Sequence, residues 1–578
     1  MQPTTPSPTS SSDMLKRYGP IIAIVAVIAV VAVVAITRSG SSTTSTGTTT
    51  STAGSSGTPG TGTGTVPSRP GVLSFAQAKA QGKETSIDWG ERCDTSIGKL
   101  KYPSFFAGAC FAPFTGDNGG ETATGVTATS IKVVFYQAQE ADPILNYITA
   151  AVKVDDTNQE VADTMKDWID FYNHFYETYG RKVELVPFVA TGSSADEVSA
   201  RADAITIAQD IKPFAVFGGP ILTPAFGNEL AARQVLCISC GPGATYDYFE
   251  KASPYLWGLG ILPEQGKSHV VEYISKQLKG GKAEYAGQDD LKTQPRKFGV
   301  IYLSNSDDSE SAEKSFEKSL SDAGVPLEQS LSYKSPIDLQ TDAPALIAKL
   351  KSAGVTSVLF NGDPVAPQPL TRAATAQEYF PEWVMTGSVL TDTSAFGRTY
   401  DQQQWAHAFG VSFAAARSAG SGSKALYRWY FGREAPSQTA AAVNVINPAL
   451  FYAVIQGVGP KLTAQDFKDA LFAADPTARA ISQPSLSYGN KGIWPRPDYV
   501  GVDDATLVWW NPTISGKDEI ERDGPGLYMY VDGGKRYLPG EWPAGENKVF
   551  KTDGSVSIYE TVPPTEQVPT YPSPAGAK

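Results

Sequence analysis

Two glycine-rich loops are the residues whose types and spacing best fit the binding of a small molecule. The apolar run 213–217 breaks at the loop 218–220, and the apolar run 235–239 breaks at the loop 241–245. A helical segment that Thr223 can cap lies between them. In an open parallel sheet, ligands bind just beyond the carboxyl ends of the strands. We therefore expect the two loops to form a binding site.

Catalytic motifs are poorly represented. The three histidines are scattered along the chain, and the H-E-x-x-H, G-x-S-x-G and Walker patterns are missing. Two overlapping S-x-x-K matches, which start at Ser311 and Ser315, fall on a charged helix and carry no signal. A hydrolase that uses two carboxylates stays open as an alternative, although no pair stands out. We expect a binding protein that is not an enzyme and uses no cofactor.

Four cysteines, Cys93, Cys110, Cys237 and Cys240, form two distant pairs. An even number of cysteines in an exported chain predicts disulfides, most simply Cys93–Cys110 and Cys237–Cys240. The second pair could instead be a redox pair or two buried thiols, but it lies in an expected strand and does not open a helix. Two distant pairs also argue against a zinc site, so we expect no bound metal.

The N-terminal region has the composition of a membrane anchor. Residues 20–36 are almost all Ile, Val and Ala, and they follow Lys16 and Arg17. As a helix with a rise of about 1.5 Å per residue, the segment covers roughly 26 Å, enough to cross a bilayer core. The preceding basic residues favour an orientation with the N-terminus inside the cell. A cleaved signal peptide is the alternative, but no good cleavage site follows, so we favour an uncleaved signal-anchor.

The composition after this anchor places the remaining chain outside the cytoplasm. Residues 39–65 are almost all Ser, Thr and Gly, which is typical of a flexible tether. The formal net charge of -12 argues against a nucleic-acid partner, which would select a basic surface. We expect a protein that is anchored in the cell membrane by its N-terminal helix, with an extracytoplasmic body.

Beyond residue 130, short apolar strands alternate with amphipathic helices. The first series has expected strands at 131–135 and 182–189, and expected helices at 160–179 and 195–210, before the two loops described above. The second series comprises, in order, segments 264–278, 297–303, 309–323, 331–333, 341–353, 356–360, 368–379 and 383–386. Each series is too long for one small sheet, so the fold class is α/β with two doubly wound, Rossmann-like lobes.

The segments after residue 411 show how the chain moves between the lobes. Expected helices at 440–457 and 463–474 have no parallel strand after them, so we expect them to return to the first lobe. Residues 500–510 predict a late strand for the second lobe. Residues 71–130 read as an irregular extension, and residues 511–578 as a loosely structured tail.

The order of elements over about 131–510 resembles the type I periplasmic binding proteins, and specifically the branched-chain amino-acid receptor family of ABC importers. The segments that carry the resemblance are FAVFGG with the following Thr223, VLCISCGPGAT, RKFGVIYL and VTSVLFNG. The front segment, with IDWGERCD and its two cysteines, is similar to extensions of actinobacterial members. The resemblance implies a Venus-flytrap of two lobes joined by a three-strand hinge, with a ligand trapped between them.

The resemblance places the ligand contacts of the first lobe in the two glycine-rich loops. The implied contacts are Gly219, Pro220, Gly243, Ala244 and Thr245. The Thr245 hydroxyl matches the threonine of the family and, with free backbone N–H groups, would hold an anionic group such as a carboxylate. The serines that are usual in the first loop are missing here, so this contact has to come from the backbone or from Thr223.

The second lobe departs from the pattern of the family. Members that bind α-amino acids carry an acidic residue where this chain has Ser388, and the usual tyrosines are missing from the neighbouring loops. Asp307, Asp308 and Asp363 are expected to face the cleft instead, which favours a polar or cationic ligand. Helix capping by the first two and a turn at Asp363 are the structural alternatives. The list of candidate ligand residues is completed by Gln137 and Gln139, after the first strand.

The expected divisions are a cytoplasmic tail (1–19), a transmembrane signal-anchor (20–36), a linker (37–70), an N-terminal extension (71–130), a first lobe (131–262 and 412–485), a second lobe (263–411 and 486–510) and a C-terminal extension (511–578). We expect an extracytoplasmic substrate-binding protein of an ABC importer that captures an amino acid, amide or related polar solute and delivers it to ABC permease subunits. The alternatives are a sensory or adhesion module that presents ligand to another surface protein, and an extracytoplasmic enzyme.

Overall fold

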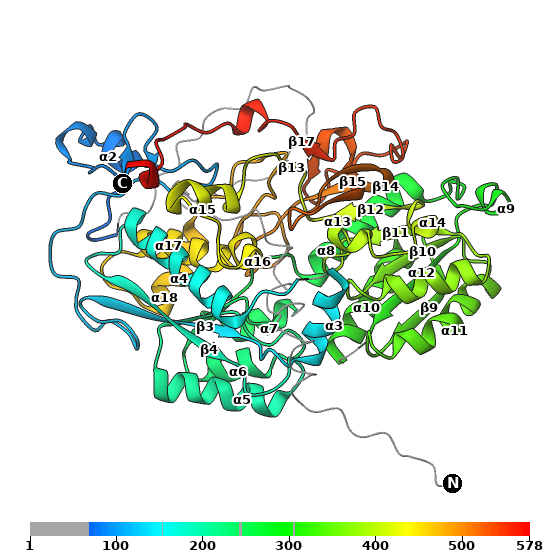
Figure 1. Cartoon of the computed structure of the whole chain (residues 1–578), viewed down its shortest axis with the longest axis horizontal. Coiled ribbons are helices and arrows are strands. Elements are labelled where there is room, and N and C mark those ends of the chain that lie inside the picture. Colours follow the sequence, from blue (N-terminus) through cyan, green and yellow to red (C-terminus); the bar gives the residue numbers. More distant parts are fainter. Residues whose placement is uncertain (1–68, 153, 242–244, 305–306, 578) are drawn as a thin grey trace, which may run out of the picture.

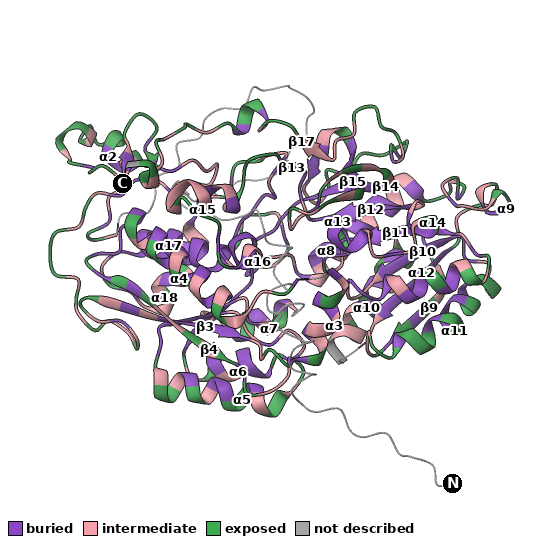
Figure 2. Cartoon of the chain, in the orientation of Figure 1, coloured by how far each residue is buried: buried purple, intermediate pink, exposed green. Residues whose placement is uncertain are grey.

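A computed structural model describes residues 69–577, except 153, 242–244 and 305–306. The expected anchor and most of its linker therefore lie outside the described residues. Two α/β lobes lie side by side and are linked by several chain crossings (Figure 1). In each lobe the strands are buried beneath helices whose outer faces are exposed (Figure 2).

Lobe 1 is built on a parallel five-stranded sheet of order β4-β3-β5-β6-β7. Its strands are β3 (Ser130–Gln137), β4 (Lys182–Val189), β5 (Ala215–Phe217), β6 (Leu236–Ile238) and β7 (Leu256–Trp257). The helices between them are α3 (Pro143–Val152), α4 (Asn158–Phe175), α5 (Glu197–Thr206), α6 (Ala225–Ala232) and α7 (Tyr246–Lys251). Because every strand runs in the same direction, the loops after β3, β5 and β6 meet at one edge.

Helix α4 ends earlier than its sequence pattern predicts. Thr157 and Glu160 form a capping box at its start, which fixes the first turn. The backbone becomes extended at Tyr176, and the chain then turns through Gly180 at a positive φ. The side chains of Tyr176 and Tyr179 are buried although they lie beyond the end of the helix. They continue the apolar pattern of the sequence, which is why that pattern predicts a helix up to residue 179.

Lobe 2 contains a larger, mixed sheet. Its path is β15-β14-β12-β11-β10-β8-β9, with β16 paired to β14. The strands are β8 (Phe298–Leu303), β9 (Leu327–Tyr333), β10 (Ser357–Asn361), β11 (Glu382–Thr386), β12 (Ala408–Ser412), β14 (Ala505–Lys517), β15 (Asp523–Tyr530) and β16 (Arg536–Tyr537). Its helices are α8 (Pro263–Tyr273), α9 (Asp289–Lys292), α10 (Asp307–Asp322), α11 (Leu339–Ser352), α12 (Pro367–Ala376), α13 (Ser394–Gly397) and α14 (Gln402–Trp405).

The C-terminal region is more ordered than its composition suggests. Strand β14 continues to Lys517 and pairs antiparallel with β15, so residues beyond 510 complete the sheet of lobe 2. Further on, the buried carboxylate of Glu566 accepts hydrogen bonds from the backbone N–H groups of Ile481 and Ser482. The tail then crosses to the N-terminal extension on lobe 1, where the Tyr571 hydroxyl donates to Asp94 at 2.9 Å (Figure 1). Gly and Pro weaken the strand signal of the sequence without preventing these contacts.

The chain returns to lobe 1 after β12, as the alanine-rich pattern predicts. The returning elements are β13 (Arg417–Ser418), α15 (Ser423–Phe431), α16 (Gln438–Ala442), α17 (Ile446–Val458) and α18 (Ala464–Ala473), and β13 pairs with β17 (Ile558–Tyr559). Within the described part of the chain, one stretch, Gln438–Val458, is long and apolar enough to cross a membrane. It is 89% buried inside the protein, which identifies it as a core helix.

The N-terminal extension packs on lobe 1 as a small separate unit. It contains α2 (Phe75–Ala80), β1 (Cys93–Asp94) and β2 (Lys99–Leu100). The expected disulfide Cys93–Cys110 is present and lies in a small apolar cluster with Trp89. The expected Cys237–Cys240 disulfide is also present, at the end of β6. Each pairing predicted from the sequence is therefore confirmed.

Three segments cross between the lobes, and the first and third pair with each other. In the first crossing Gly258 N donates to Tyr499 O, and Val502 N donates to Gly260 O. The third crossing folds back on itself, and Ser487 N donates to the carbonyl of Gly501. The second crossing, after β12, is held by Arg536, which donates to the carbonyls of residues 413 and 414. The three crossings between the lobes that the family resemblance implies are therefore present, although none of them forms a regular strand.

Candidate functional site

The predicted first-lobe residues lie in the loops at the carboxyl edge of the lobe 1 sheet. Thr223 is buried, and its hydroxyl accepts a hydrogen bond from Ala225 N at the start of α6, as predicted from the sequence. Thr245 caps α7 by accepting from Tyr248 N at 3.4 Å. A Cβ on Gly219 would approach the Phe226 ring to 3.0 Å, which leaves little space for a side chain in the first loop.

The other predicted lobe 1 residues are less exposed to a ligand. Gln137 is buried, and its amide nitrogen donates to Asn158 O at 2.9 Å. Gln139 is half-buried in the loop between β3 and α3. Pro220 is buried beside Gly219, and Gly243 and Ala244 lie outside the described residues. The lobe 1 edge therefore offers a ligand mainly backbone groups and Thr245.

The polar groups of Asp363 and Ser388 are occupied by the chain itself. Asp363 Oδ2 accepts from the Tyr333 hydroxyl at 2.6 Å, and its Oδ1 accepts from two backbone N–H groups that open α12. Burial raises the pKa of Asp363. Ser388 Oγ accepts from Gly362 N and donates to the carbonyl of Phe360. Asp307 and Asp308 are the first two residues of α10, and their side chains lie outside the described residues.

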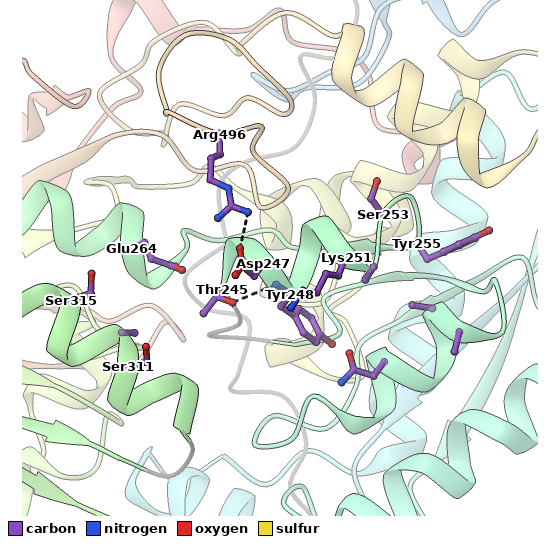
Figure 3. A pocket seen from close by; sticks show the side chains of 15 residues that line it. Thr245, Asp247, Tyr248, Lys251, Ser253, Tyr255, Glu264, Ser311, Ser315 and Arg496 are labelled. Atoms are coloured by element: carbon purple, nitrogen blue, oxygen red, sulfur yellow. Dashed lines mark hydrogen bonds and ion pairs between the residues drawn. The ribbon is translucent and has the colours of Figure 1, made fainter.

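A cavity of about 730 Å³ opens where lobe 1 faces α10 of lobe 2 (Figure 3). This volume is in the range of small-molecule sites. Its walls come from both lobes and from the third crossing, and they include Thr245, Tyr248, Lys251, Ser311, Ser315 and Arg496. The serine, threonine and tyrosine hydroxyls suit a polar ligand more than a hydrocarbon.

Most of these wall residues were not predicted from the sequence. Of the predicted ligand residues, Thr245 is among those that line the cavity. Ser311 and Ser315 are one helical turn apart and exposed on the same face of α10. The two S-x-x-K matches that contain them therefore reflect the polar surface of this helix. Arg496 lies in a stretch of irregular backbone with no sequence signal for a site.

The charged residues on one side of the cavity are already paired. Arg496 Nη2 binds the carboxylate of Asp247 at 2.8 Å (Figure 3). It also contacts Glu250. The guanidinium carbon of Arg496 lies 5.2 Å from the centre of the Tyr246 ring. These contacts hold the third crossing against α7, so the wall of the cavity and the hinge are connected directly.

Glu264 differs from its charged neighbours because one of its carboxylate oxygens has no partner. It lies in the first turn of α8, lines the cavity, and its Oε2 is buried without a hydrogen bond. Its other oxygen accepts a long bond of 3.4 Å from Tyr246 N. Burial raises the pKa of Glu264, because the charged form lacks compensating donors.

Helix α3, which has no counterpart among the expected elements, closes another side of the space between the lobes. Both of its ends connect to lobe 1, where Asp142 accepts from the Ser194 hydroxyl at 2.7 Å. Its apolar face, with Ile148 and Val152, packs into the core of lobe 2. Tyr147 accepts from the side chain of Gln340 on α11 at 2.6 Å. The sequence does carry a signal for this helix, an Asp-Pro start followed by an apolar run.

The histidines have no arrangement typical of catalysis. His269 is fully buried at the hinge, where its Nδ1 accepts from Trp542 Nε1 and its Nε2 donates to Asp503 O. Burial lowers the pKa of His269 to about 4, so the ring is neutral at physiological pH. His174 lies on the surface of α4, beside the ring of Tyr430. Among the described residues no group of three or more His, Cys, Asp or Glu could hold a metal ion.

Comparison with known proteins identifies one family. The family model described as "Periplasmic binding protein" matches residues 144–493, which cover parts of both lobes, the first two crossings and the start of the third. Among curated proteins, none matches the sequence.

Several solved structures are similar to the chain. A solute binding protein of an ABC transporter from Rhodopseudomonas palustris BisB5, in complex with 3,4-dihydroxy benzoic acid, is 12% identical, with 71% of this chain and 98% of that chain covered and a TM-score of 0.49. The branched-chain amino acid transporter substrate binding protein LivJ from Streptococcus pneumoniae, in complex with isoleucine, is 18% identical, with 70% and 100% covered and a TM-score of 0.47. A fatty acid ABC transporter substrate-binding protein from Thermomonospora curvata is 15% identical, with 78% and 100% covered and a TM-score of 0.47. These values carry no inference about the ligand of this chain.

Proposed function

Because this chain belongs to the periplasmic binding protein family, we propose that it is the extracytoplasmic solute-binding protein of an ABC importer. It captures a small polar solute between its lobes and presents it to the permease subunits. The observation that carries this proposal is the cavity of about 730 Å³ walled by α7 of lobe 1 and α10 of lobe 2. A ligand that touches both walls stabilises the closed arrangement of the lobes, which the permease recognises.

The ligand contacts that we propose combine the lobe 1 edge with the helix opposite. The backbone of the loops at Gly219 and Pro220 and the hydroxyl of Thr245 face the ligand from lobe 1. Ser311 and Ser315 face it from α10. Asp363 and Ser388 support the lobe 2 loops from behind, because their polar atoms already bind the backbone and Tyr333.

Ligand binding is expected to raise the stability of the full-length chain in mild detergent. A ligand present at about a hundred times its Kd stabilises the folded state by about 2.7 kcal/mol. Thermal unfolding against amino acids, amides, polyamines, sugars and small acids measures this shift. If no compound raises the midpoint, the solute-binding proposal is wrong and a module that interacts with another surface protein becomes the better explanation.

A substitution that fills the cavity tests its position. Ala312 lies on α10, is half-buried and lines the cavity, so Ala312→Trp places a large ring where the ligand would lie. We expect this variant to lose the ligand-induced shift while its unfolding midpoint without ligand stays near that of the wild type. Ser321→Trp, at an exposed position of the same helix away from the cavity, is the matched control and is expected to keep the shift. A full shift in Ala312→Trp would place the ligand elsewhere.

We further propose that residues 20–36 anchor the protein in the membrane and that the Ser/Thr/Gly linker holds the body outside the cell. The first described residue, Arg69, supports an attachment through lobe 1, since its guanidinium contacts Asp466 of α18 at 3.5 Å. We expect the full chain in the membrane fraction and a variant that carries a cleavable signal sequence in place of 1–38 in the soluble extracytoplasmic fraction. Equal distribution of the two would contradict the anchor.

A further inference from the structure

Glu264 is the acidic residue of the cavity that the protein does not neutralise. One helical turn later, Lys267 is committed to Glu313, with Nζ 2.7 Å from Oε2. On the other side, Arg496 is committed to Asp247 and Glu250. No ion pair of Glu264 is present among the described residues, and its Oε2 is buried with no hydrogen bond. A buried carboxylate oxygen without a donor is costly unless another molecule supplies one.

Two charged side chains of the cavity walls have no ion pair among the described residues. The charged residues that line the cavity are Asp247 and Glu264, which are acidic, and Lys251 and Arg496, which are basic. Arg496 is bound to Asp247 and Glu250, so Glu264 and Lys251 are the wall charges that remain for a ligand. An ammonium group beside Glu264 compensates its charge, whereas a carboxylate at that place would add a like charge.

Tyr246 lies beside Glu264 and gives it one weak donor. The backbone N–H of Tyr246 donates to Glu264 Oε1 at 3.4 Å. The side chain of Tyr246 is only 7% exposed, and its hydroxyl interacts with Gln265. The protein therefore supplies no strong donor to the Glu264 carboxylate.

Other residues of the cavity walls offer further acceptors. Ser311 and Ser315 of α10 and Thr245 of lobe 1 bring hydroxyl oxygens to the cavity, and Tyr248 of α7 brings an aromatic ring (Figure 3). A primary ammonium group has three N–H donors and no acceptor. It can therefore bind one carboxylate oxygen and two hydroxyl oxygens at once, and an aromatic face nearby is attractive to it.

We propose that the cavity selects solutes that carry a primary ammonium group and that Glu264 is the residue that recognises this group. This inference rests on the solute-binding function proposed above. The carboxylate of Glu264 accepts one N–H of the ammonium group, and hydroxyl oxygens of the cavity walls accept the others. Solutes that carry only carboxylates or neutral hydroxyls leave Glu264 without a partner and bind more weakly.

A set of four-carbon compounds tests the charge preference directly. The probes are butane-1,4-diamine, 4-aminobutanoate, butane-1,4-diol and butanedioate, extended to ethane-1,2-diamine, agmatine and spermidine to cover length. Affinity is measured by titration calorimetry on the full-length chain in mild detergent. We expect at least one ammonium-bearing probe to bind and the diol and the dicarboxylate to bind at least about 30-fold more weakly, as the loss of a charge-assisted contact implies.

Glu264→Gln keeps the shape of the side chain and removes its charge. We expect the affinity of the ammonium probe to fall by about 30-fold or more. Glu264→Asp keeps the charge and is expected to retain the preference for the ammonium probe over the diol. Glu229→Gln, an acidic residue of α6 that pairs with Arg233 and does not line the cavity, is the control and should bind as the wild type does. Unfolding midpoints without ligand show whether each variant is folded.

The outcomes separate this inference from the proposed function. If the diol or the dicarboxylate binds as tightly as the amines, or if Glu264→Gln leaves amine binding unchanged, ammonium recognition by Glu264 is wrong and solute binding stands. If the wild type binds only solutes of the wider panel that carry no ammonium group, the inference is again wrong and the function stands. If no compound of either set binds the wild type, both fail.

Discussion

Arg536→Met is expected to lower the free energy of unfolding by about 3–5 kcal/mol, because it leaves a buried carboxylate without its counter-charge. Arg536 and Asp504 are both buried, and Nε of the arginine lies 2.8 Å from Oδ1 of the aspartate. The same guanidinium donates to the carbonyls of Phe413, Ala414 and Asp504. It therefore ties the second crossing to the third, and methionine replaces its apolar stem but none of these donors.

Chemical denaturation of the full-length chain in mild detergent measures this loss. Arg479→Met is the matched control, since Arg479 also makes a two-point contact with a carboxylate, that of Glu541, but both partners are about half exposed. We expect the control to lose less than about 1 kcal/mol. A loss of similar size in both variants would show that the Arg536 contacts do not hold the hinge together.

Asp498→Asn is expected to change how stability depends on pH. Asp498 is fully buried in the third crossing, and burial raises its pKa from 3.8 to about 7. The folded state therefore keeps a proton that the unfolded chain releases near pH 4. The stability that this proton contributes is fully present below pH 4 and is lost as the pH rises towards 7. Asparagine imitates the protonated form at every pH and removes this loss.

The expected size follows from the pKa shift. The free energy of unfolding of Asp498→Asn minus that of the wild type should rise by about 3 kcal/mol when the pH is raised from 5 to 8. Asp503 titrates with the same sign, since burial and the nearby Asp498 raise its pKa to about 8. The titratable groups that face the pair are Tyr246, His269, Tyr488, Lys491 and Asp504.

Denaturation curves at the two pH values measure the difference between variant and wild type. Asp553→Asn, at an exposed position of the C-terminal region, is the control and should show no such difference. If Asp498→Asn follows the wild type at both pH values, the Asp498 carboxyl is ionised throughout and the buried hinge does not hold a proton.

Local sequence patterns predicted the secondary structure best where the fold needs no long-range information. Strand β4 has the predicted bounds, and β3 and α18 differ from them by a few residues, because alternation and helical periodicity are properties of neighbouring residues. The end of α4 was misjudged, since buried aromatic residues continue the apolar pattern into the turn before Gly180. The hairpin of β14 and β15 was missed because its glycines and prolines interrupt the alternation, while pairing across the sheet still stabilises it.

The candidate site was predictable only in part. Thr245 lines the cavity as predicted. It could be predicted because a strand, a glycine-rich loop and the start of a helix follow each other in the sequence there. Asp363 and Ser388 were assigned to the ligand by position, yet their polar atoms bind the chain itself, which no local pattern reveals. Glu264 shows the opposite case. Its sequence position at a helix start suggests an ordinary first-turn acid, and only its neighbours in space show an oxygen without a donor.

The sequence by itself determined that this chain forms two α/β lobes with three crossings and pairs its cysteines locally, because short-range periodicity, turn residues and cysteine spacing fix those features. The tertiary structure decided which groups meet. Asp247, Glu264, Ser311 and Arg496 belong to four separate elements, and folding brings them to one cavity. The free energy of a carboxylate depends on the donors and charges within a few ångströms of it, whatever their distance along the chain. Ligand preference therefore belongs to the folded arrangement.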